Sequence, residues 1–483
     1  MTGVRDAAWT TRRVEEGGAP VLEIDPKEGA GELAARFPLY VLSLRMSGVI
    51  KTGTGHREVK MVGALVLQAL HACCGYILHV EVAGYSKMMG WGYVLSVANS
   101  TGKLFACALF IEPRGSPSVC DAAFARLRPR DWKILGLVRV CILAMTLTAS
   151  YLGVHFIVLA VAWPEMYAGY WWALPPFLVG FYLGSMPWWF GVTGHFILSS
   201  VATMLQLYGL REELEVVVAD AEGTETARSW RSRALKVVST VRLSWTEELS
   251  DSGGVGETPR RVKATGGGGE DGSVLKDGGG GDGGDGGGGT AVDDRAERFR
   301  GAHSCMDDQL QRFSYGWQFY VLVVEFLIVT IVIIYVGCLA TDTWRREDYV
   351  GAHPRVYALA FILFVAVMLS TIIPLLAALI GCITFFADRL PRTVSRTAAH
   401  RRPHLAALRE QMEAAQSGFY LMGSRISLGV LLSMFYLSLT TAVGVGIYLS
   451  EEGYVGLNIA GSGEGSGASG GGASSLAAAT SST

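Results

Sequence analysis

Charged residues are scarce in this chain. Lysine and arginine do not outnumber aspartate and glutamate, as they do in many nucleic-acid-binding proteins. Asp, Glu, Lys and Arg make up only 17% of the 483 residues, whereas 50% are hydrophobic, and the mean hydropathy is +0.33. An ordinary soluble protein of this length is richer in charge. The formal net charge is −2, which supplies no overall field for nucleic acid. The composition therefore indicates an integral membrane protein.

Several marks of secreted, metal-binding and duplicated proteins are also missing. The eight cysteines form no CxxC pair and lie mostly in apolar stretches, so neither a disulfide framework nor a zinc site is indicated. His71, Cys73 and Cys74 are close in sequence but point different ways on a helix, so we expect no metal and no other cofactor. The polar first 35 residues resemble no signal peptide. Without an internal repeat, a transporter built from inverted halves is disfavoured.

Seven stretches are apolar over the roughly 20 residues that a helix needs to cross a bilayer. They are 61–81, 90–111, 134–162, 171–206, 316–340, 355–387 and 426–449. The fourth and sixth are shorter than the roughly 40 residues that two crossings and a turn require. Each is therefore predicted to be one tilted helix that extends beyond the bilayer. The sequence predicts an all-α membrane protein with seven transmembrane helices.

The arginines and lysines predict the orientation, because short basic loops stay in the cytosol. Basic residues gather before the first helix and in 112–133, 207–315 and 388–425. The first two of these segments require the same side, so both the first and the second helix must cross. They must do so although Asn99, Ser100, Thr101 and Lys103 interrupt the second stretch. We expect a cytosolic N-terminus and an extracellular C-terminus.

The predicted organisation alternates membrane helices with cytosolic segments. It comprises a cytosolic tail with a pre-helix segment (1–60), helices one to four (61–206), a cytosolic loop (207–315), helices five to seven (316–450, with the cytosolic segment 388–425) and a disordered extracellular tail (451–483). Within the loop, 266–289 holds 15 glycines in 24 residues, so 251–290 is predicted to be a disordered linker. Helical patterns at 203–249 and 292–315 are predicted to extend the fourth and fifth helices.

Three segments carry a resemblance to a known family. They are Phe37–Gly48 before the first helix, Met306–Leu310 with Phe313 and Tyr315 to Tyr335, and Ser417–Leu421 followed by Ile426–Leu428 and Tyr436–Thr441. Together with the topology, these segments resemble the insect gustatory and odorant receptor superfamily, in particular its gustatory receptor-like proteins outside insects. The resemblance covers about 37–450 except the linker.

The resemblance implies a homo- or heterotetrameric ligand-gated cation channel. In that family the seventh helix lines the pore, and the outer halves of the second to sixth helices hold the ligand. The family's last helix usually ends with Thr-Tyr, five apolar residues and Gln-Phe. Here Thr440 keeps the threonine, Thr441 stands for the tyrosine, and Ile447-Tyr448 replace Gln-Phe.

The last apolar stretch also has a small and polar face of its own. Ser433, Leu437, Thr440, Gly444 and Ile447 follow one another at spacings of three and four, so they share one side of a helix. Such a stripe is typical of a helix-packing seam. Around a fourfold axis it would form a hydroxyl-lined pore with an apolar constriction, and the resemblance favours this second interpretation. The predicted pore-lining residues are Ser433, Leu437, Thr440, Thr441, Val443, Gly444 and Ile447.

Glu451 and Glu452 follow directly, at the predicted outer mouth of the pore. Two in each of four subunits would place acidic side chains within a few Debye lengths of one another, each about 8 Å at physiological salt, and so concentrate cations. An ordinary solvated helix end has the same appearance. Glu451 and Glu452 are the candidates for the pore mouth.

Ionisable and aromatic residues mark the other helices. Lys103 is expected to extend to the interface or to pair with Glu325. His155 lies near an aromatic belt, most of which is typical of interfacial anchoring. The remainder predicts an apolar pocket with few polar contacts, with Tyr151, His155, Trp171, Trp172, Phe177, Tyr182 and Tyr357 as candidates.

Other functional classes fit less well. A G-protein-coupled receptor has its N-terminus outside, and a seven-helix metal hydrolase needs clustered histidines that the isolated His155 and His195 do not form. A small-molecule carrier, or an intramembrane enzyme, remains the alternative. The sequence favours a non-enzymatic chemoreceptor channel in the plasma membrane or an intracellular membrane. Its expected partners are further subunits, lipid, a small-molecule ligand and permeant cations, and no nucleic acid.

Overall fold

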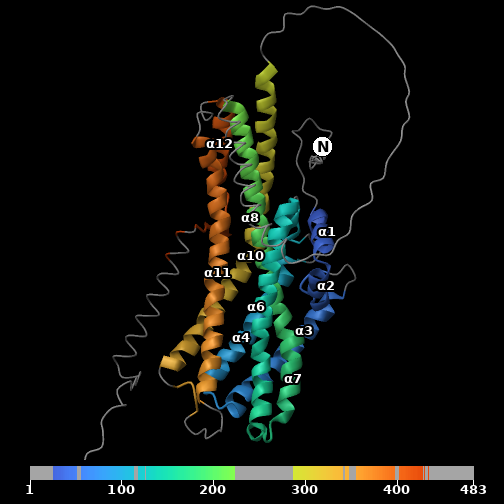
Figure 1. The fold of residues 1–483 in the computed structure, drawn as a ribbon, viewed down its shortest axis with the longest axis vertical. Coiled ribbons are helices and arrows are strands. Elements are labelled where there is room, and N and C mark those ends of the chain that lie inside the picture. The colour runs from blue at the N-terminus through green and yellow to red at the C-terminus, as the bar shows by residue number, and fades with distance from the viewer. Residues whose placement is uncertain are drawn as a thin grey trace, which may run out of the picture.

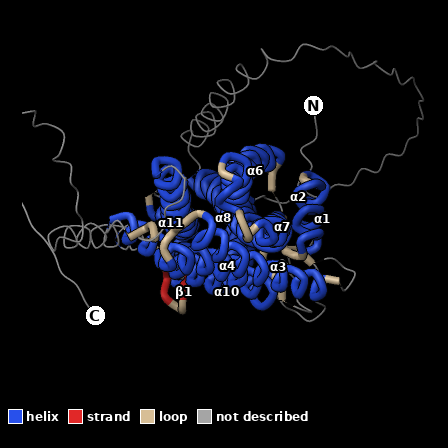
Figure 2. Tube along the Cα trace, turned by 90° about the horizontal axis from the view of Figure 1, so that it is seen from below, coloured by secondary structure: helices blue, strands red, loops and turns tan. Residues whose placement is uncertain are grey.

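The protein is a bundle of long helices. The computed structural model describes residues 26–51, 56–113, 118–125, 127–222, 287–340, 343–346, 355–396 and 402–427, together with Gly429 and Ser433. Figure 1 shows the helices running along the long axis, and Figure 2 shows them packed side by side when seen end-on. The predicted tail 451–483 and all of the predicted linker except 287–290 lie outside these ranges.

Six segments of the described chain are helices long and apolar enough to cross a membrane. The first is α3 (Arg57–Ile77) with the π-helix η1 (Leu78–Val82), and the second is α4 (Lys87–Ala106) with the π-helix η2 (Cys107–Ile111). After the short α5 (Asp121–Phe124), the third span is α6 (Pro129–Ala162). These segments contain the first three predicted stretches.

The fourth span is long and changes its helical type along its length. Beyond the 3-10 turn η3 (Pro164–Tyr167), it consists of η4 (Trp171–Ala173), α7 (Leu174–Val179), the π-helix η5 (Gly180–Ser185) and α8 (Met186–Glu222). The fifth and sixth are α10 (Gly287–Ala340) and α11 (Arg355–Ser395). The fourth and sixth stretches each form one continuous helical run, as predicted, and the chain is a multi-pass membrane protein.

The predicted seventh helix stays a prediction. Of the stretch 426–449, the structure describes only Ile426, Ser427, Gly429 and Ser433, the last two in helical conformation. The orientation across the membrane is likewise a prediction. The two ends of the bundle are therefore named here by their structure.

The side of the bundle toward α12 (Pro403–Ala415), called the α12 end, holds the segments that were predicted to share a side, with α1 and α2 about midway along the long axis in Figure 1. Helices α1 (Pro26–Arg36) and α2 (Pro38–Ser47) pack there against α5 and α8. The guanidinium of Arg57 donates to the carbonyl of Gly48 at 3.2 Å and to that of Glu112 at 2.6 Å. It thus ties the end of α2 to the end of the second span. Residues before the first span and after the second therefore lie together, so the two spans run in opposite directions beside each other.

The other end, called the far end, joins two connections that the sequence placed on the opposite side. Tyr85 forms an antiparallel bridge with Arg345, and Ser86 N–H donates to the carbonyl of Trp344 at 2.9 Å. The segments after the first and fifth spans are therefore neighbours. This pairing agrees with the alternation of sides that the basic residues predict.

At the α12 end the helices project as a group. Figure 1 shows α8, α10 and α11 reaching α12 (Pro403–Ala415) at the top of the view. A hairpin of β1 (Tyr420–Leu421) and β2 (Ser424–Arg425) follows, with Met422 and Gly423 at positive φ in its turn. Its backbone is held by Thr384 Oγ1, which accepts from Phe419 N–H, and by Ser314 Oγ, which accepts from Tyr420 N–H. The hairpin is thereby fastened to α10 and α11.

The polar residues of the second span face the interior of the bundle. Asn99, Ser100 and Lys103 are fully buried. Lys103 Nζ donates to the carbonyl of Trp189 at 3.1 Å and to Thr193 Oγ1 at 2.9 Å, so the expectation that this lysine extends to the interface is wrong. Its ammonium also lies 4.3 Å from the centre of the Trp189 ring. The side chain of Glu325, its other expected partner, lies outside the described residues.

Candidate functional site

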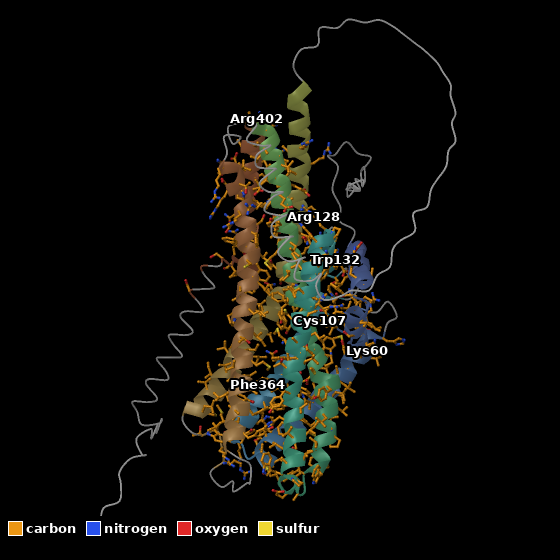
Figure 3. The ribbon with its side chains drawn as sticks, in the orientation of Figure 1. Lys60, Cys107, Arg128, Trp132, Phe364 and Arg402 are labelled. Carbon is orange, nitrogen blue, oxygen red and sulfur yellow. The ribbon has the colours of Figure 1, made fainter. Side chains whose placement is uncertain are left out.

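A cavity, called the bundle cavity, lies among all six spans. It offers about 50 Å³ to the centres of water-sized molecules, and it is partly open. Its lining residues are His71, His79, Tyr93, Ser96, Val97, Ser100, Leu152, Phe181, Ser185, Met186, Trp189, Phe190, Ile331, Tyr335, Phe361, Val365 and Met368. In Figure 3 the labelled Phe364, on the same stretch of α11, lies well below Arg402 of the α12 end. The cavity thus belongs to the far half of the bundle.

Aromatic rings form much of the cavity wall and pack on one another. The His79 ring lies 4.0 Å from the Tyr93 ring and 4.8 Å from the Phe156 ring, measured between centroids. The His71 ring lies within 5.4 Å of both Tyr93 and Phe181. Flat, polarisable walls of this kind bind apolar and aromatic molecules well.

A chain of neutral hydrogen bonds runs beside the cavity. Thr101 Oγ1 donates to Gln68 Oε1 at 2.7 Å, and Gln68 Nε2 donates to Ser100 Oγ at 3.1 Å. Ser185 Oγ lies 2.7 Å from His71 Nδ1, and the Tyr93 hydroxyl contacts His71 Nε2. Each of these side chains can form its hydrogen bonds in the neutral form, which suits a site at membrane depth. These bonds hold α3, α4 and η5 in a fixed relation around the cavity.

The π-helix η5 supplies acceptors to this chain. A π-helical turn interrupts the regular ladder of backbone hydrogen bonds and leaves carbonyl groups available. The carbonyl of Gly184 accepts from Gln68 Nε2 at 3.1 Å, and the carbonyl of Ser185 accepts from Ser100 Oγ at 2.9 Å. Side chains of two neighbouring helices thereby stabilise the irregular segment.

Two glycines allow α3 to approach η5 closely. A Cβ atom on Gly180 would lie 2.5 Å from the carbonyl oxygen of Leu67, and one on Gly184 would lie 2.7 Å from Leu67 Cβ. The spacing of four residues is that of the GxxxG pattern, which brings membrane helices into backbone contact. This seam, Gly180 and Gly184 against Leu67, sets the distance between the walls that carry His71 and Ser185.

The residues predicted for a ligand pocket fall in three places, none of which is among the cavity lining given above. Tyr151, His155 and Tyr357 form one cluster, in which the two tyrosine hydroxyls are 3.4 Å apart and His155 stacks on Tyr357 at 5.3 Å. Phe177 is buried against His71, and the Tyr182 hydroxyl donates to the carbonyl of Ser150. Trp171 and Trp172 are 49% and 60% exposed. Their role in ligand binding stays a prediction.

The predicted pore falls almost entirely outside the described residues. Ser433 is described as helical and exposed. Leu437, Thr440, Thr441, Val443, Gly444, Ile447, Glu451 and Glu452 lie beyond that part of the chain. The pore and its mouth therefore stay predictions.

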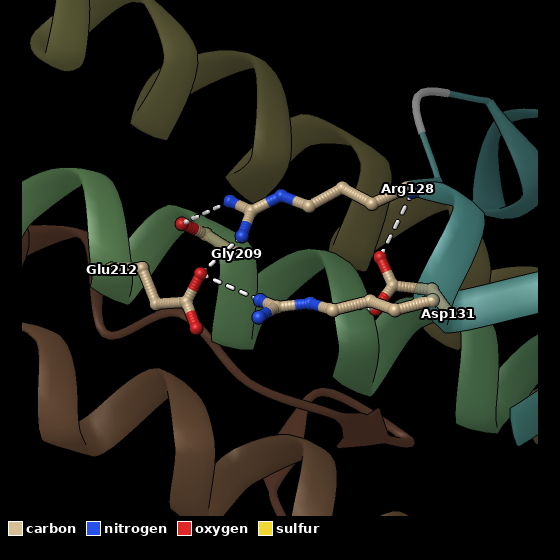
Figure 4. A network of polar contacts seen from close by, with 5 residues as sticks. Arg128, Asp131, Gly209 and Glu212 are labelled. Carbon is tan, nitrogen blue, oxygen red and sulfur yellow. Dashed lines mark hydrogen bonds and ion pairs between the residues drawn. The ribbon is translucent and has the colours of Figure 1, made fainter. Parts of the chain in front are cut away.

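A second polar region, the arginine network, lies at the α12 end, where α6 begins beside α8. Arg128 and Arg130 both contact the carboxylate of Glu212, the second at 2.6 Å. Arg128 also donates to the carbonyl of Gly209 at 3.2 Å, and Asp131 accepts from Arg128 N–H at 2.9 Å. Figure 4 shows the two guanidinium groups converging on this one carboxylate. The charges are largely balanced among themselves, which is typical of a structural clamp.

Two carboxyl groups, those of Glu112 and Asp121, lie near each other just after the second span. Burial raises the pKa of Glu112. Burial, followed by repulsion from Glu112, raises the pKa of Asp121 to about 7. The nearby Arg57 and Lys51 oppose the shift of Glu112 only in part. This pair is therefore the most pH-sensitive feature that we find at the α12 end outside the spans.

Sequence reasoning missed most of the cavity. His71 and His79 are spaced by eight residues on one apolar helix, and Ser96 and Ser100 by four on the next. Residues at these spacings share a helix face, so a polar stripe on each helix was available as a signal. The π-helices that turn these residues toward one another had no equivalent signal in the sequence.

Comparisons with known proteins give structural similarity only. No family model matches the chain, and no curated protein matches it. Among solved structures it is similar to the insect olfactory receptor OR5 from Machilis hrabei, with 12% identity and a TM-score of 0.48 over 86% of this chain and 98% of the receptor. It is similar to the same receptor in complex with eugenol, with the same identity and TM-score, over 87% of this chain and 100% of the receptor.

Proposed function

We propose that this chain is a subunit of a ligand-gated cation channel of the gustatory receptor-like type, in which a small molecule binds the bundle cavity. The observation that carries this proposal is the cavity itself, which six spans enclose with aromatic walls and a few neutral polar groups. Sites of that composition are the usual form of a small-molecule pocket. The resemblance of the three sequence segments to the insect receptor superfamily points to the same class.

The arrangement around the cavity supports a receptor better than an enzyme. The lining holds two histidines but no carboxylate, lysine or arginine, and within the described residues no group of three or more His, Cys, Asp or Glu side chains is placed to hold a metal ion. A binding site needs only shape and a few hydrogen bonds, which this one has. The expected assembly is a homo- or heterotetramer around the stretch 426–449, with Thr440 and its neighbours lining the pore.

Two segments of the resemblance are packed into the described bundle. Phe37 of the pre-helix segment packs on Trp132 at 5.8 Å. Phe419 is fully buried and packs on Phe313 at 6.3 Å. The closing segment is thus fixed to the helices that project at the α12 end. That projection offers each subunit a surface outside the membrane for contact with its copies.

Recording currents from cells that express the full chain tests the proposal. We expect single-channel steps carried by cations when small aromatic compounds are applied. Thr440→Leu, in the predicted pore, should abolish the current while surface expression and subunit number stay unchanged. Thr148→Leu, the same change at an exposed position of α6, is the matched control. A saturable flux without unitary steps, or a purified particle with one subunit, would instead show a carrier or a receptor that does not conduct.

A further inference from the structure

The short helix α2 carries apolar side chains on both its inner and its outer face. Val41 and Leu44 are buried against the bundle. On the outer face, Leu39, Leu42 and Met46 are 78%, 51% and 68% exposed, and their spacings of three and four residues place them in one row. A helix that borders water ordinarily carries polar residues on its outer side. The outer row of α2 therefore indicates an apolar medium.

This row adjoins the lipid-facing surface of the first span. The end of α2 lies beside the first turn of α3, because Lys60 Nζ donates to the carbonyl of Arg45 at 2.8 Å. From that turn onward, α3 exposes apolar side chains, with Val59, Val62 and Val66 at 71%, 60% and 56%. Figure 1 shows α2 at the level where α3 begins. The apolar row thus continues the surface that meets lipid tails, at one boundary of the membrane.

Basic side chains lie at both ends of the row. At one end Arg45 is exposed, and the Lys60 ammonium lies against the last carbonyls of the helix. At the other end, the guanidinium of Arg139 lies 4.7 Å from the centre of the ring of Phe37, the residue directly before α2. Within the described ranges, no carboxylate forms an ion pair with Arg45, Lys60 or Arg139. Their charges are therefore available to an anion from outside the chain.

The combination of an apolar row and flanking cations narrows the kind of partner. A soluble anion would leave the row uncovered, and a wholly apolar partner would leave the cations unpaired. Anionic phospholipids satisfy both, because their tails are apolar and their headgroups carry the negative charge. The helix is 10 residues long, or about 15 Å, so it can lie along the boundary between headgroups and tails.

We propose that α2 is an in-plane helix of the membrane interface that binds anionic phospholipids. Their tails contact Leu39, Leu42 and Met46, and their phosphates accept hydrogen bonds from Arg139 and Arg45. The inference concerns a surface distant from the predicted pore. It holds equally for a channel, a carrier and a receptor that does not conduct.

Binding of two short-chain lipids tests the proposal. Full-length protein in a neutral detergent is titrated with dioctanoyl phosphatidylglycerol and dioctanoyl phosphatidylcholine, which share their tails and differ in net charge. Dissociation constants are taken from thermal stabilisation, with free concentrations corrected for partition into empty micelles. We expect the anionic lipid to bind roughly tenfold more tightly or better, because each nearby cation contributes about a fivefold factor. Glycerol 3-phosphate, which has no tails, should not stabilise the protein at the same concentrations.

Matched substitutions separate the charges from the apolar row. Arg139→Gln should weaken phosphatidylglycerol binding roughly fivefold and phosphatidylcholine binding less, whereas Arg396→Gln, at an exposed position of α11, should change neither. Met46→Gln should weaken both lipids about equally, because their tails are the same. Met422→Gln, at the exposed turn of the hairpin, should leave both unchanged.

Several results would overturn the inference. Equal affinities of the natural protein for the two lipids would do so even where a variant does not fold. Glycerol 3-phosphate that binds as tightly as phosphatidylglycerol would show an anion site without a lipid. Lipid binding that neither Arg139→Gln nor Met46→Gln changes would place the lipid elsewhere. A smaller number of subunits in Met46→Gln, with lipid binding intact, would show that a second copy covers α2.

Discussion

The two halves of the bundle solve the same problem, the burial of polar groups, by different means. In the far half, neutral side chains such as Gln68, Ser100 and Ser185 bond to one another and to carbonyls of a π-helix. At the α12 end, charged side chains pair, as Arg128 and Arg130 do with Glu212 and Arg425 does with Asp388. The medium explains the difference, because a charge in lipid is costly whereas near water it is partly solvated.

This contrast teaches where sensitivity to conditions should lie. Neutral hydrogen bonds in a dry interior respond little to salt or pH, but they depend on close backbone contact. Ion pairs near water tolerate small shifts in position but weaken with salt. The far half should therefore be sensitive to added volume, and the α12 end to pH and ionic strength.

The largest effect is expected at the glycine seam of the far half. Gly184→Ala places a Cβ 2.7 Å from Leu67 Cβ, so α3 and η5 must separate, and the free energy of unfolding should fall by about 2–3 kcal/mol. Gly136→Ala on α6 is the matched control, because its Cβ would meet nothing within 4 Å. The apparent melting temperatures of both variants in one detergent measure the difference. Equal values would mean that the seam is not tightly packed.

A smaller effect is expected from pH at the α12 end. Since the pKa of Asp121 is raised to about 7, above its unfolded value of about 3.9, the folded state binds more protons. The free energy of unfolding therefore falls as pH rises from about 4 to about 7. Asp121→Asn removes this loss and should be more stable than the natural protein at pH 8 by about 1–2 kcal/mol, after allowance for partial exposure.

At pH 3 the same variant and the natural protein should be nearly equally stable, because the carboxyl is then mostly protonated in both states. Asp308→Asn, at an exposed position of α10, is the control and should leave the pH profile unchanged. Thermal unfolding followed at several pH values measures the slopes. A natural protein that gains stability between pH 5 and pH 7 relative to Asp121→Asn would contradict the expected sign.

The smallest effect is expected from the arginine network. Glu212→Gln removes the carboxylate that Arg128 and Arg130 share and should lower the free energy of unfolding by about 1 kcal/mol at low salt. The loss should shrink in molar salt, because exposed charges are screened there. Gln68→Leu in the far half provides the contrast, since its loss should be the same at both salt concentrations. A salt-dependent loss in Gln68→Leu would remove the distinction between the halves.

Length and hydropathy predicted the six spans well, because a helix that crosses lipid must be long and apolar whatever it packs against. The placement of basic residues predicted which connections share an end, and the contact of Arg57 with Glu112 agrees with this for the first two spans. The burial of Lys103 could not be predicted from its position in the sequence. A lysine near a helix end ordinarily reaches the interface, whereas here Thr193 and the Trp189 carbonyl, far away in sequence, hold its ammonium inside.

The cavity was less predictable than the fold. Aromatic residues near the outer interface suggested a pocket around Tyr151 and His155, whereas the described cavity lies beside that cluster, with Leu152 and Phe361 in its wall, and includes residues of η1 and η5. Such π-helical segments depend on tertiary partners, as Gln68 and Ser100 show by bonding to η5. A single sequence contains the residues that form these contacts but does not show which of them meet in the fold.

The hairpin at Tyr420–Arg425 has a mechanical consequence. One helix, α11, forms part of the cavity wall through Phe361 and Met368. Through Thr384 it also holds Phe419, the residue directly before the hairpin. Met368 and Thr384 are separated by sixteen positions, about 24 Å of helix, with Pro374 between them. The last apolar stretch of the chain therefore begins at a hairpin that is held by α11, the helix that also forms part of the cavity wall. A change in the bend of α11 at Pro374 would therefore move residue 426, where that stretch begins.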